Sequence, residues 1–246
     1  MYRFYVNEDD ITGSNITITG RDVNHIKNVL RMTQGERIIA NDGDGTDYYC
    51  VIENISQDEV GLVIESSKKS EAELKTKLYL FQSLPKKDKM EFIIQKSVEL
   101  GVYEVIPIIT KRCVVKLEDI KKQEKKTARW QAIAEAAAKQ SARGIIPDVK
   151  MPMKLADAVK YAKKLEYNII PFEHAEGMDY SRNIMDTAAG CQSVGIFIGP
   201  EGGFEREEVE LAKQAGMKVV SLGNRILRTE TAGMTVLSIL MFKISD

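Results

Sequence analysis

The sequence contains few of the residues from which metal centres and disulfide frameworks are built. Three cysteines (Cys50, Cys113 and Cys191) and two histidines (His25 and His174) occur among 246 residues, and no two cysteines have Cys-x-x-Cys spacing. We therefore expect no zinc site and no other bound metal. Three widely spaced thiols are typical of a reducing compartment, which favours a cytoplasmic protein over a secreted one.

Long apolar segments are also missing. The first residues, Met1–Tyr5, are followed by acidic residues and not by the apolar run of a signal peptide. The most apolar stretch, Thr235–Ile244, is shorter than the roughly 20 residues that a transmembrane helix requires. The sequence therefore predicts neither an export signal nor a membrane partner.

The common loops that bind nucleotide phosphates are absent as well. The chain contains no Gly-x-x-x-x-Gly-Lys-Ser/Thr motif, and no Gly-x-Gly-x-x-Gly motif follows a predicted strand, which disfavours a nucleotide hydrolase. Asp42–Gly45 looks like a glycine-rich loop, but it lies between two β-rich runs and lacks the later glutamate of a calcium loop. We interpret it as a hairpin turn.

The charge that the sequence does contain is unevenly distributed. Residues 1–70 have 7 Lys/Arg against 12 Asp/Glu, whereas residues 71–246 have 28 against 24. The basic excess is strongest in residues 111–143, with ten basic and four acidic side chains, and in residues 75–96, with six and two. Such asymmetry hints at a polyanionic partner. An ordinary solvated helix face remains an equal explanation for Lys121–Lys126.

The hydrophobic pattern divides the chain into two parts. Residues 1–65 contain short β-branched runs separated by Gly, Asn and Asp, with one predicted helix at Asp22–Leu30. A polar linker follows at Ser66–Thr76. Beyond it, strands and helices alternate, which predicts a parallel sheet covered on both faces. The strands and helices expected there are Leu78–Leu84, Asp88–Leu100, Val102–Ile109, Asp119–Arg143, Tyr167–Pro171, Val194–Ile198, Glu205–Ala215, Lys218–Leu222 and Thr229–Ile244.

Three loops follow predicted strands of this second part, at residues 171–174, 198–204 and 221–232. In open α/β sheets, ligands bind beyond the carboxyl ends of the strands. The middle loop contains three glycines, which let a ligand approach the backbone closely, although a tight strand-to-helix turn also explains them. His174, in the first loop, fits either a wall of a cofactor pocket or a loop histidine without a role.

The third loop is the most informative. It places the apolar pair Ile226 and Leu227 between two arginines, directly before Thr229, which is a suitable helix N-cap. A solvated loop with a capped helix explains Thr229 and the following Glu230, but it does not explain the apolar pair. Apolar side chains and free backbone amides together suit an adenine ring.

The two glycine-containing loops together resemble a known signature. IGPEGGF (198–204) and SLGNRILRTETA (221–232) are similar to the paired motifs of the ribosomal RNA small subunit methyltransferase E family, which belongs to the SPOUT class and makes N3-methyluridine in 16S rRNA. The resemblance extends over nearly the whole chain, through HIKNVLR (25–31), KKDKMEFIIQKSVELG (86–101) and RWQAIAEAAAKQSAR (129–143).

This resemblance implies an architecture and a cofactor. It implies a PUA-like, RNA-binding β-barrel over residues 1–70 and a SPOUT-type α/β domain with a trefoil knot over residues 71–246. It also implies a homodimer that acts on 16S rRNA of the 30S subunit, with S-adenosyl-L-methionine (SAM) held in the knot. The residues expected to hold SAM are Phe172, Gly199, Pro200, Glu201, Gly202, Leu222, Gly223, Asn224, Ile226 and Leu227.

The chemistry assigns further roles within the same loops. Uridine N3 must lose its proton, so we expect Arg228, and Arg225 second, to stabilise the resulting anion. Glu201 or Glu230 is expected to accept the proton, although Glu201 could instead brace its loop and Glu230 could serve as a helix-start carboxylate. The residues expected to contact RNA are Arg3, Lys27, Arg31, Lys86, Lys87, Lys89, Arg112, Arg143 and Arg225.

Two other functions stay open at this point. One is a knotted methyltransferase that acts on tRNA or on a ribose 2′-hydroxyl, because its sheet and cofactor loops would look similar. The other is a catalytically silent RNA-binding or ribosome-assembly module, which would not bind SAM.

Overall fold

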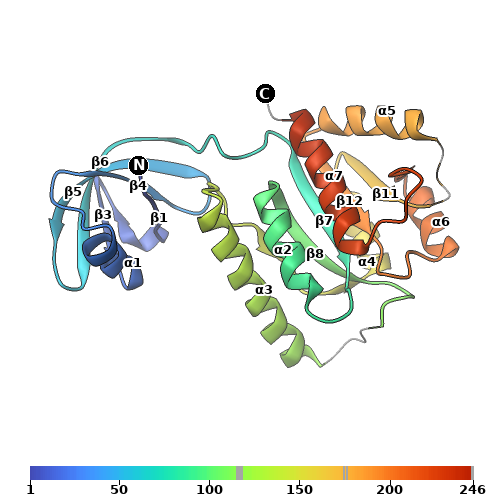
Figure 1. Cartoon of the computed structure of the whole chain (residues 1–246), viewed down its shortest axis with the longest axis horizontal. Coiled ribbons are helices and arrows are strands. Elements are labelled where there is room, and N and C mark those ends of the chain that lie inside the picture. The colour runs from blue at the N-terminus through green and yellow to red at the C-terminus, as the bar shows by residue number, and fades with distance from the viewer. Residues whose placement is uncertain (115–118, 174, 176, 245–246) are drawn as a thin grey trace. The chain divides into compact units, whose positions relative to one another are not determined.

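The computed structural model describes residues 1–114, 119–173, 175 and 177–244. His174 therefore lies outside the described residues. The chain divides into two compact units, each of which is described by itself; Figure 1 labels their elements. The first unit contains Met1–Glu73 and Ala138–Ile146, and the second contains Leu74–Ala137 and Pro147–Asp246.

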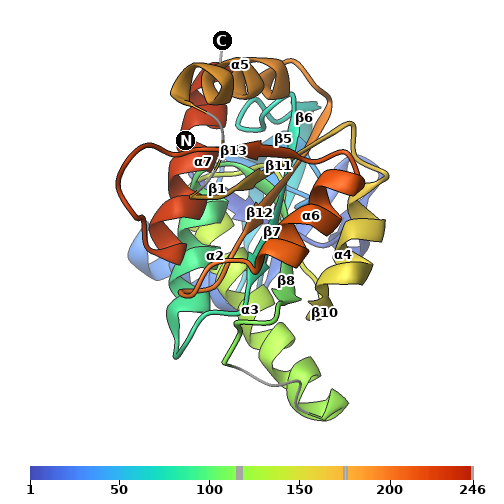
Figure 2. The same ribbon diagram turned by 90° about the vertical axis from the view of Figure 1, so that its right-hand side faces the viewer.

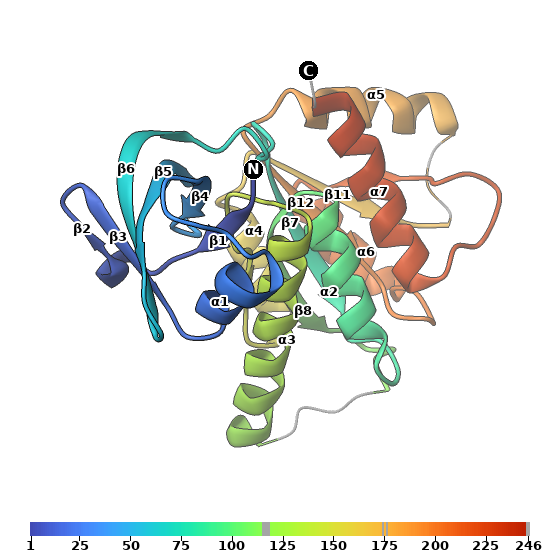
Figure 3. The same cartoon turned by 60° about the vertical axis from the view of Figure 1, so that its left-hand side comes forward.

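The first unit is built on a six-stranded sheet with the order β1-β4-β5-β6-β3-β2 (Figure 3). β1 pairs with β4 in parallel, and all other neighbours are antiparallel. The strands are β1 (Arg3–Tyr5), β2 (Ile11–Thr12), β3 (Asn15–Thr19), β4 (Arg37–Asn41), β5 (Thr46–Ile55) and β6 (Glu59–Lys69). The predicted hairpin turn at residues 42–45 connects the antiparallel strands β4 and β5.

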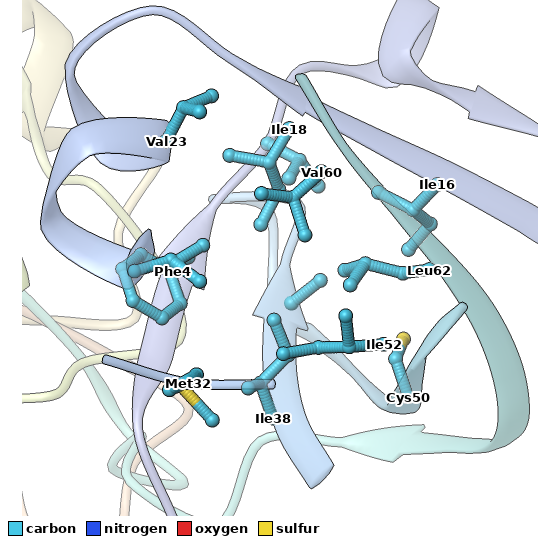
Figure 4. Close-up of a cluster of buried hydrophobic side chains, with 13 residues drawn as sticks. Phe4, Ile16, Ile18, Val23, Met32, Ile38, Cys50, Ile52, Val60 and Leu62 are labelled. Atoms are coloured by element: carbon cyan, nitrogen blue, oxygen red, sulfur yellow. The ribbon is translucent and has the colours of Figure 1, made fainter. Parts of the chain in front are cut away.

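The core of the first unit follows from the two-residue period of its strands. In β3, Ile16 and Ile18 are buried between more exposed neighbours. In β4, Ile38 and Ala40 are buried on either side of the half-buried Ile39. Figure 4 shows these side chains converging with those of the other strands. This cluster contains the buried apolar side chains of β3, β4, β5 and β6.

The helix predicted at Asp22–Leu30 consists of two short elements. One helical turn, α1 (Arg21–Asn24), continues into a π-helical turn, η2 (His25–Val29), and a 3₁₀ turn, η1 (Glu8–Asp10), lies earlier in the chain. Ile26 is fully buried, so the apolar side of this segment packs as expected. The change of helix type was not predicted, because the spacing of apolar residues does not distinguish single turns of similar period.

The first unit also includes a segment from much later in the sequence. The Gly45 amide donates to the Gly144 carbonyl at 2.9 Å, and the Ile146 amide donates to the Gly43 carbonyl at 3.0 Å. The turn between β4 and β5 is thus hydrogen-bonded to residues 138–146. No local pattern in the sequence predicts this pairing.

The second unit contains a parallel sheet with the order β10-β8-β7-β12-β11-β13, and β9 pairs with β8 (Figure 2). Its strands are β7 (Lys77–Ser83), β8 (Val102–Ile109), β9 (Asp148–Val149), β10 (Met153–Lys154), β11 (Tyr167–Pro171), β12 (Ser193–Ile198) and β13 (Lys218–Val220). Its helices are α2 (Lys89–Glu99), α3 (Ile120–Gln140), α4 (Leu155–Ala162), α5 (Met178–Ala189), α6 (Arg206–Gln214) and α7 (Thr229–Ile244), with the last residues of α3 grouped in the first unit. The predicted parallel sheet is observed.

Helices cover both faces of this sheet. α4 and α6 pack on one face, and α2 and α7 pack on the other, with α5 beside α7 (Figure 2). Phe81 of β7 and Phe197 of β12 stack in the centre with ring centroids 4.2 Å apart. Because both faces of the sheet are covered, these two strands are apolar along most of their length, as buried parallel strands are. No described helix is long and apolar enough to cross a membrane.

The chain leaves the edge of the sheet before its last helix. After β13, residues 221–228 return toward the middle of the sheet, where α7 packs against β7, β12 and α2. This return is where the trefoil knot expected from the resemblance would lie. The sequence pattern did not predict α4 and α5, which come directly before and directly after β11 in the chain.

Candidate active site at the carboxyl edge of the sheet

Four loops begin at one edge of the parallel sheet. β7, β12, β11 and β13 are neighbours and run parallel, so their carboxyl ends meet at the same edge. We call the segments that follow them the β7 loop (84–88), the β12 loop (199–205), the β11 loop (172–173) and the β13 loop (221–228). The three loops predicted to form the site are thus brought together, and the β7 loop joins them.

Thr229 connects two of these strand ends to the start of α7. Its hydroxyl accepts a hydrogen bond from Gln82 Nε2 at 2.8 Å and donates to the Gly199 carbonyl at 2.6 Å. Gln82 and Thr229 are both buried. The Thr229 hydroxyl therefore links β7, the β12 loop and the start of α7. Thr229 was predicted to be the N-cap of the helix, but it is the first residue of α7 and its hydroxyl bonds residues distant in sequence.

The β12 loop is a tight turn that requires its glycines. The Gly203 amide donates to the Pro200 carbonyl at 2.9 Å, and Gly203 has a φ of +69°. A Cβ at Gly199 would come within 3.2 Å of the Gly203 backbone. Arg112 braces the turn, because its guanidinium bonds the Glu205 carboxylate at 2.8 Å and also the Gly202 carbonyl. The guanidinium predicted to contact RNA is thus already engaged within the unit.

The β13 loop is held at its start and open beyond it. The Ser221 amide donates to Ser181 Oγ at 2.8 Å, and the Gly223 amide donates to Ser221 Oγ at 3.2 Å. From Asn224 to Arg228, the backbone amides donate to no acceptor within the described part of the chain. Ile226 is 91% exposed, which is unusual for an isoleucine.

These loops suit a nucleoside ligand. Phe172, Leu222 and Leu227 are partly buried apolar side chains, and the free amides nearby are donors that a ligand can use. Gly223 has a φ of +98°, and among the described residues no atom lies within 4 Å of the position that its Cβ would occupy. The loop therefore has donors, apolar surface and open space side by side.

Two carboxylates of the site share one ammonium group. Lys89 Nζ lies 3.4 Å from Glu201 Oε1 and 3.2 Å from Glu230 Oε2, and the Lys86 amide donates to Glu201 Oε1 at 3.0 Å. Burial raises the pKa of the Glu201 carboxyl, but hydrogen bonds from its own amide, from the Lys86 amide and from Lys89 outweigh burial and lower it. Glu201 is therefore ionised at neutral pH.

The two arginines of the β13 loop are available to a ligand. Arg225 and Arg228 are exposed, and within the described residues neither side chain makes a hydrogen bond or ion pair. Lys86 and Lys87 of the β7 loop are exposed as well. Three of the basic residues predicted to bind RNA, together with Arg228, thus project from the same edge of the sheet as the predicted cofactor loops.

Two of the arginines predicted to bind RNA, Arg3 and Arg143, are engaged inside the first unit. Arg143 is 4% exposed and pairs with Glu73, whose carboxylate also accepts the Gly144 amide at 2.8 Å. Arg3 pairs with Asp47 at 2.8 Å and donates to the Ala142 carbonyl at 2.9 Å. Both guanidinium groups therefore fasten residues 138–146 to the barrel.

Lys27 and Arg31 are exposed on the same unit. Lys27 donates to the Ser56 carbonyl at 3.3 Å and lines an open hollow of about 350 Å³ between α1 and the turn before β6. Arg31 has a φ of +54°, which is uncommon for a residue with a side chain. These two residues, unlike Arg3 and Arg143, present their charge to solvent.

Two contributors to the site were not predicted. Gln82 had a visible signal, because it is a polar residue in the alternating row Leu78, Leu80, Gln82, Leu84. Ser181 of α5, which holds the Ser221 amide, had none. Its position depends on α5 packing against β13, and no sequence pattern indicates that contact.

Comparison with known proteins identifies the class of the two units. A family model described as an RNA methyltransferase domain matches residues 72–241, and one described as an RNA methyltransferase PUA domain matches residues 18–65. The first match spans more than half of the chain. The fold and the site therefore belong to an RNA methyltransferase that carries a PUA domain.

Individual relatives narrow the class to one family. Ribosomal RNA small subunit methyltransferase E of Bacillus subtilis is 38% identical over 232 residues, which is 92% of this chain and 90% of the relative. A crystal structure of the enzyme of that name from Neisseria gonorrhoeae, bound to S-adenosyl methionine, is 32% identical with a TM-score of 0.79, and covers 97% of this chain and 95% of its own. The chain belongs to the ribosomal RNA small subunit methyltransferase E family.

A second solved structure agrees with this assignment. A putative methyltransferase from Legionella pneumophila, in complex with SAM, is 34% identical with a TM-score of 0.77, over 97% of this chain and 96% of its own. The expected α/β methyltransferase domain with a parallel sheet, preceded by a PUA domain, is confirmed.

Proposed function

We propose that this protein is a SAM-dependent methyltransferase that methylates N3 of a uridine in 16S rRNA of the small ribosomal subunit. The observation that carries the proposal is the convergence of the β12 and β13 loops, the three acid and base groups beside them, and two exposed arginines at one sheet edge. Relatives of this chain are named as ribosomal RNA methyltransferases, and two solved structures similar to it contain SAM.

SAM would be held by the loops that have free amides and apolar side chains. We assign its binding to Phe172 of the β11 loop, to Gly199, Pro200, Glu201 and Gly202 of the β12 loop, and to Leu222, Gly223, Asn224, Ile226 and Leu227 of the β13 loop. When bound there, SAM supplies a methyl group activated by its sulfonium. The chain must then orient the base and remove the N3 proton.

The N3 proton would move to a carboxylate of the site. Glu201 and Glu230 are the two candidates, and the proton leaves its electron pair on the uracil ring. The guanidinium of Arg228, with Arg225 second, would stabilise the negative charge that develops at the ring oxygens. Because neither arginine is committed to an internal partner among the described residues, both can turn toward the base.

Contact with RNA would come mainly from exposed basic groups. We assign it to Lys86, Lys87 and Arg225 of the second unit and to Lys27 and Arg31 of the first. Arg3, Arg112 and Arg143 are paired inside their units, so we assign them to holding the fold. The assignment of residues 1–70 to RNA binding and 71–246 to catalysis follows, with residues 138–146 packed on the first unit.

A homodimer is part of the proposal. Ile226 of the β13 loop and Phe242 of α7 are 91% and 81% exposed. Ile226 lies in the candidate site and Phe242 near the far end of α7, and apolar side chains this exposed fit coverage by a second copy of the chain. Light scattering on the purified protein tests this: a monomer mass at micromolar concentration would contradict it.

The activity is tested by transfer of labelled methyl groups from SAM to 30S subunits that lack the modification. We expect label in rRNA, and mass spectrometry of its nucleosides should identify N3-methyluridine. A ribose 2′-O-methyl product, or label in tRNA alone, would favour the other knotted methyltransferase. No label and no heat of SAM binding by calorimetry would favour a silent RNA-binding module.

The cofactor site has a matched test within the chain. Gly223 and Gly216 both have positive φ, at +98° and +88°, and a Cβ at either would meet no described atom within 4 Å. Alanine should therefore strain both backbones similarly. We expect Gly223→Ala to weaken SAM binding by roughly tenfold, about 1.4 kcal/mol, and Gly216→Ala to leave it unchanged. Equal effects of the two substitutions would show that SAM does not contact the β13 loop.

A further inference from the structure

A single ammonium group joins three segments of the candidate site. Lys89 is the first residue of α2, directly after the β7 loop. Its Nζ contacts Glu201 of the β12 loop at 3.4 Å and Glu230 of the first turn of α7 at 3.2 Å. Within the described residues these two carboxylates are its ion-pair partners. Glu91, the other carboxylate in the first turn of α2, pairs with Arg129 of α3 at 2.7 Å and not with Lys89.

The cluster is partly shielded from water. The side chains of Lys89, Glu201 and Glu230 are 31%, 27% and 16% exposed, so their interactions are screened less than those of surface pairs. Two carboxylates against one ammonium leave a net negative charge. A phosphate group approaching Lys89 would meet this negative charge, whereas the exposed Lys86 and Lys87 lack it.

We infer that Lys89 is a positioning residue for proton removal: it holds the Glu201 and Glu230 carboxylates side by side so that one can take the N3 proton of the target base. This inference rests on the proposed function and replaces the RNA contact expected for Lys89. When the proton moves from N3 to one carboxylate, the other stays paired with the ammonium, and the negative charge passes to the uracil ring beside Arg228.

The role predicts a specific pH signature. Without the ammonium, the two carboxylates repel each other, so the pKa of the proton acceptor rises. In single-turnover methyl transfer at saturating SAM and 30S subunits, Lys89→Met should lower the rate roughly 100-fold. The Glu201 pKa lies below 4.5 in the wild type, so the acidic limb of its pH–rate profile falls below about pH 5. In Lys89→Met the limb should move up into the range of about pH 5 to 9. Lys89→Arg keeps the charge and should restore the limb.

A control on the same helix separates this role from loss of a surface charge. Lys96 of α2 pairs with Glu99 at 2.8 Å, away from the loops. Lys96→Met should leave the rate and the profile unchanged. Calorimetry with SAM establishes that Lys89→Met is folded, since the cofactor affinity should stay within about twofold of wild type.

The opposite results are as clear. If Lys89→Met keeps the saturated rate and the wild-type limb and only weakens 30S binding, Lys89 is a phosphate contact and the inference is wrong. An unchanged limb with a lowered rate overturns it too, because a purely structural role does not move the acceptor pKa. An inactive wild type would instead remove the proposed function and would be seen before any variant is made.

Discussion

Two arginines of the first unit and two of the second have the same charge and opposite surroundings. Arg143 and Arg3 of the first unit bond inward, to Glu73 and Asp47 and to carbonyl groups. Arg225 and Arg228 of the second unit are exposed, and their side chains make no hydrogen bond or ion pair among the described residues. A buried paired charge contributes to folding, whereas an exposed unpaired one is free to meet a ligand. The number of arginines in a segment therefore says little about which of them bind RNA.

The largest effect on stability should come from the buried pair. Arg143→Met leaves the Glu73 carboxylate with amide donors but no counter-charge, which should cost roughly 3–5 kcal/mol of unfolding free energy. Urea denaturation measures it. Arg37→Met is the matched control, because Arg37 pairs with Glu65 in the same unit while 64% exposed, and such pairs contribute about 1 kcal/mol or less. Similar losses in the two variants would contradict the comparison.

The largest effect on activity should come from the free arginine. Arg228→Ala should lower methyl transfer to 30S subunits by roughly 100- to 1,000-fold, because the uracil anion loses its cation, while the urea midpoint stays unchanged. Arg206→Ala, at the exposed start of α6, is the control and should keep wild-type activity. Full activity in Arg228→Ala would mean that another group stabilises the anion.

The first unit should lose stability at alkaline pH. Burial raises the pKa of Tyr5 to about 12, against the opposing effect of Arg3, and its hydroxyl donates to the Arg143 carbonyl. A folded-state pKa above the ordinary value of 10.0 means that the stabilisation is complete below pH 10 and is lost as pH rises toward 12.

We expect the wild type to lose roughly 1–3 kcal/mol over that range relative to Tyr5→Phe, measured by denaturation at each pH. Tyr2→Phe, at a position that is 53% exposed, should behave like the wild type. If Tyr5→Phe follows the wild-type curve, the hydroxyl does not titrate as its burial implies.

The smallest expected effect is a loss of stability of the second unit at acidic pH, caused by protonation of Glu201. The Glu201 pKa is lowered from 4.5, so its contribution to stability is present above about pH 4.5 and is lost as pH falls through the lowered value. The stability difference between wild type and Glu201→Gln should be constant near neutrality and vanish in acid. A difference that persists in acid would show that Glu201 stabilises the loop without its charge.

Much of the fold was predictable because local periodicity reports which face of an element is buried. The strands β7, β8, β11, β12 and β13 and the helices α2, α6 and α7 lie close to where the spacing of apolar residues places them, whereas β9 and β10 were not predicted. The boundaries that failed have local causes. β6 runs on to Lys69 into the predicted linker, and β13 ends at Val220, because ladder pairing and not polarity decides where a strand stops.

The site was predictable only in part. The loops containing Gly199 and Gly223 were expected at one edge, because parallel neighbours share their carboxyl ends. Their connections were not expected. Thr229 had a local explanation as an N-cap, and its actual partners, Gln82 and Gly199, are distant in sequence. Lys89 had the charge of an RNA contact, and its two carboxylate partners became visible only in the folded chain.

The sequence by itself determined the alternation of strands and helices, the glycine turns and the family to which the chain belongs, because these depend on residues that are neighbours along the chain. The tertiary structure decided which charged side chains are paired within the fold and which are exposed to a ligand. Whether Arg143 meets Glu73, or Arg228 meets solvent, depends on segments far apart in sequence that only the packed sheet and barrel bring within hydrogen-bonding distance.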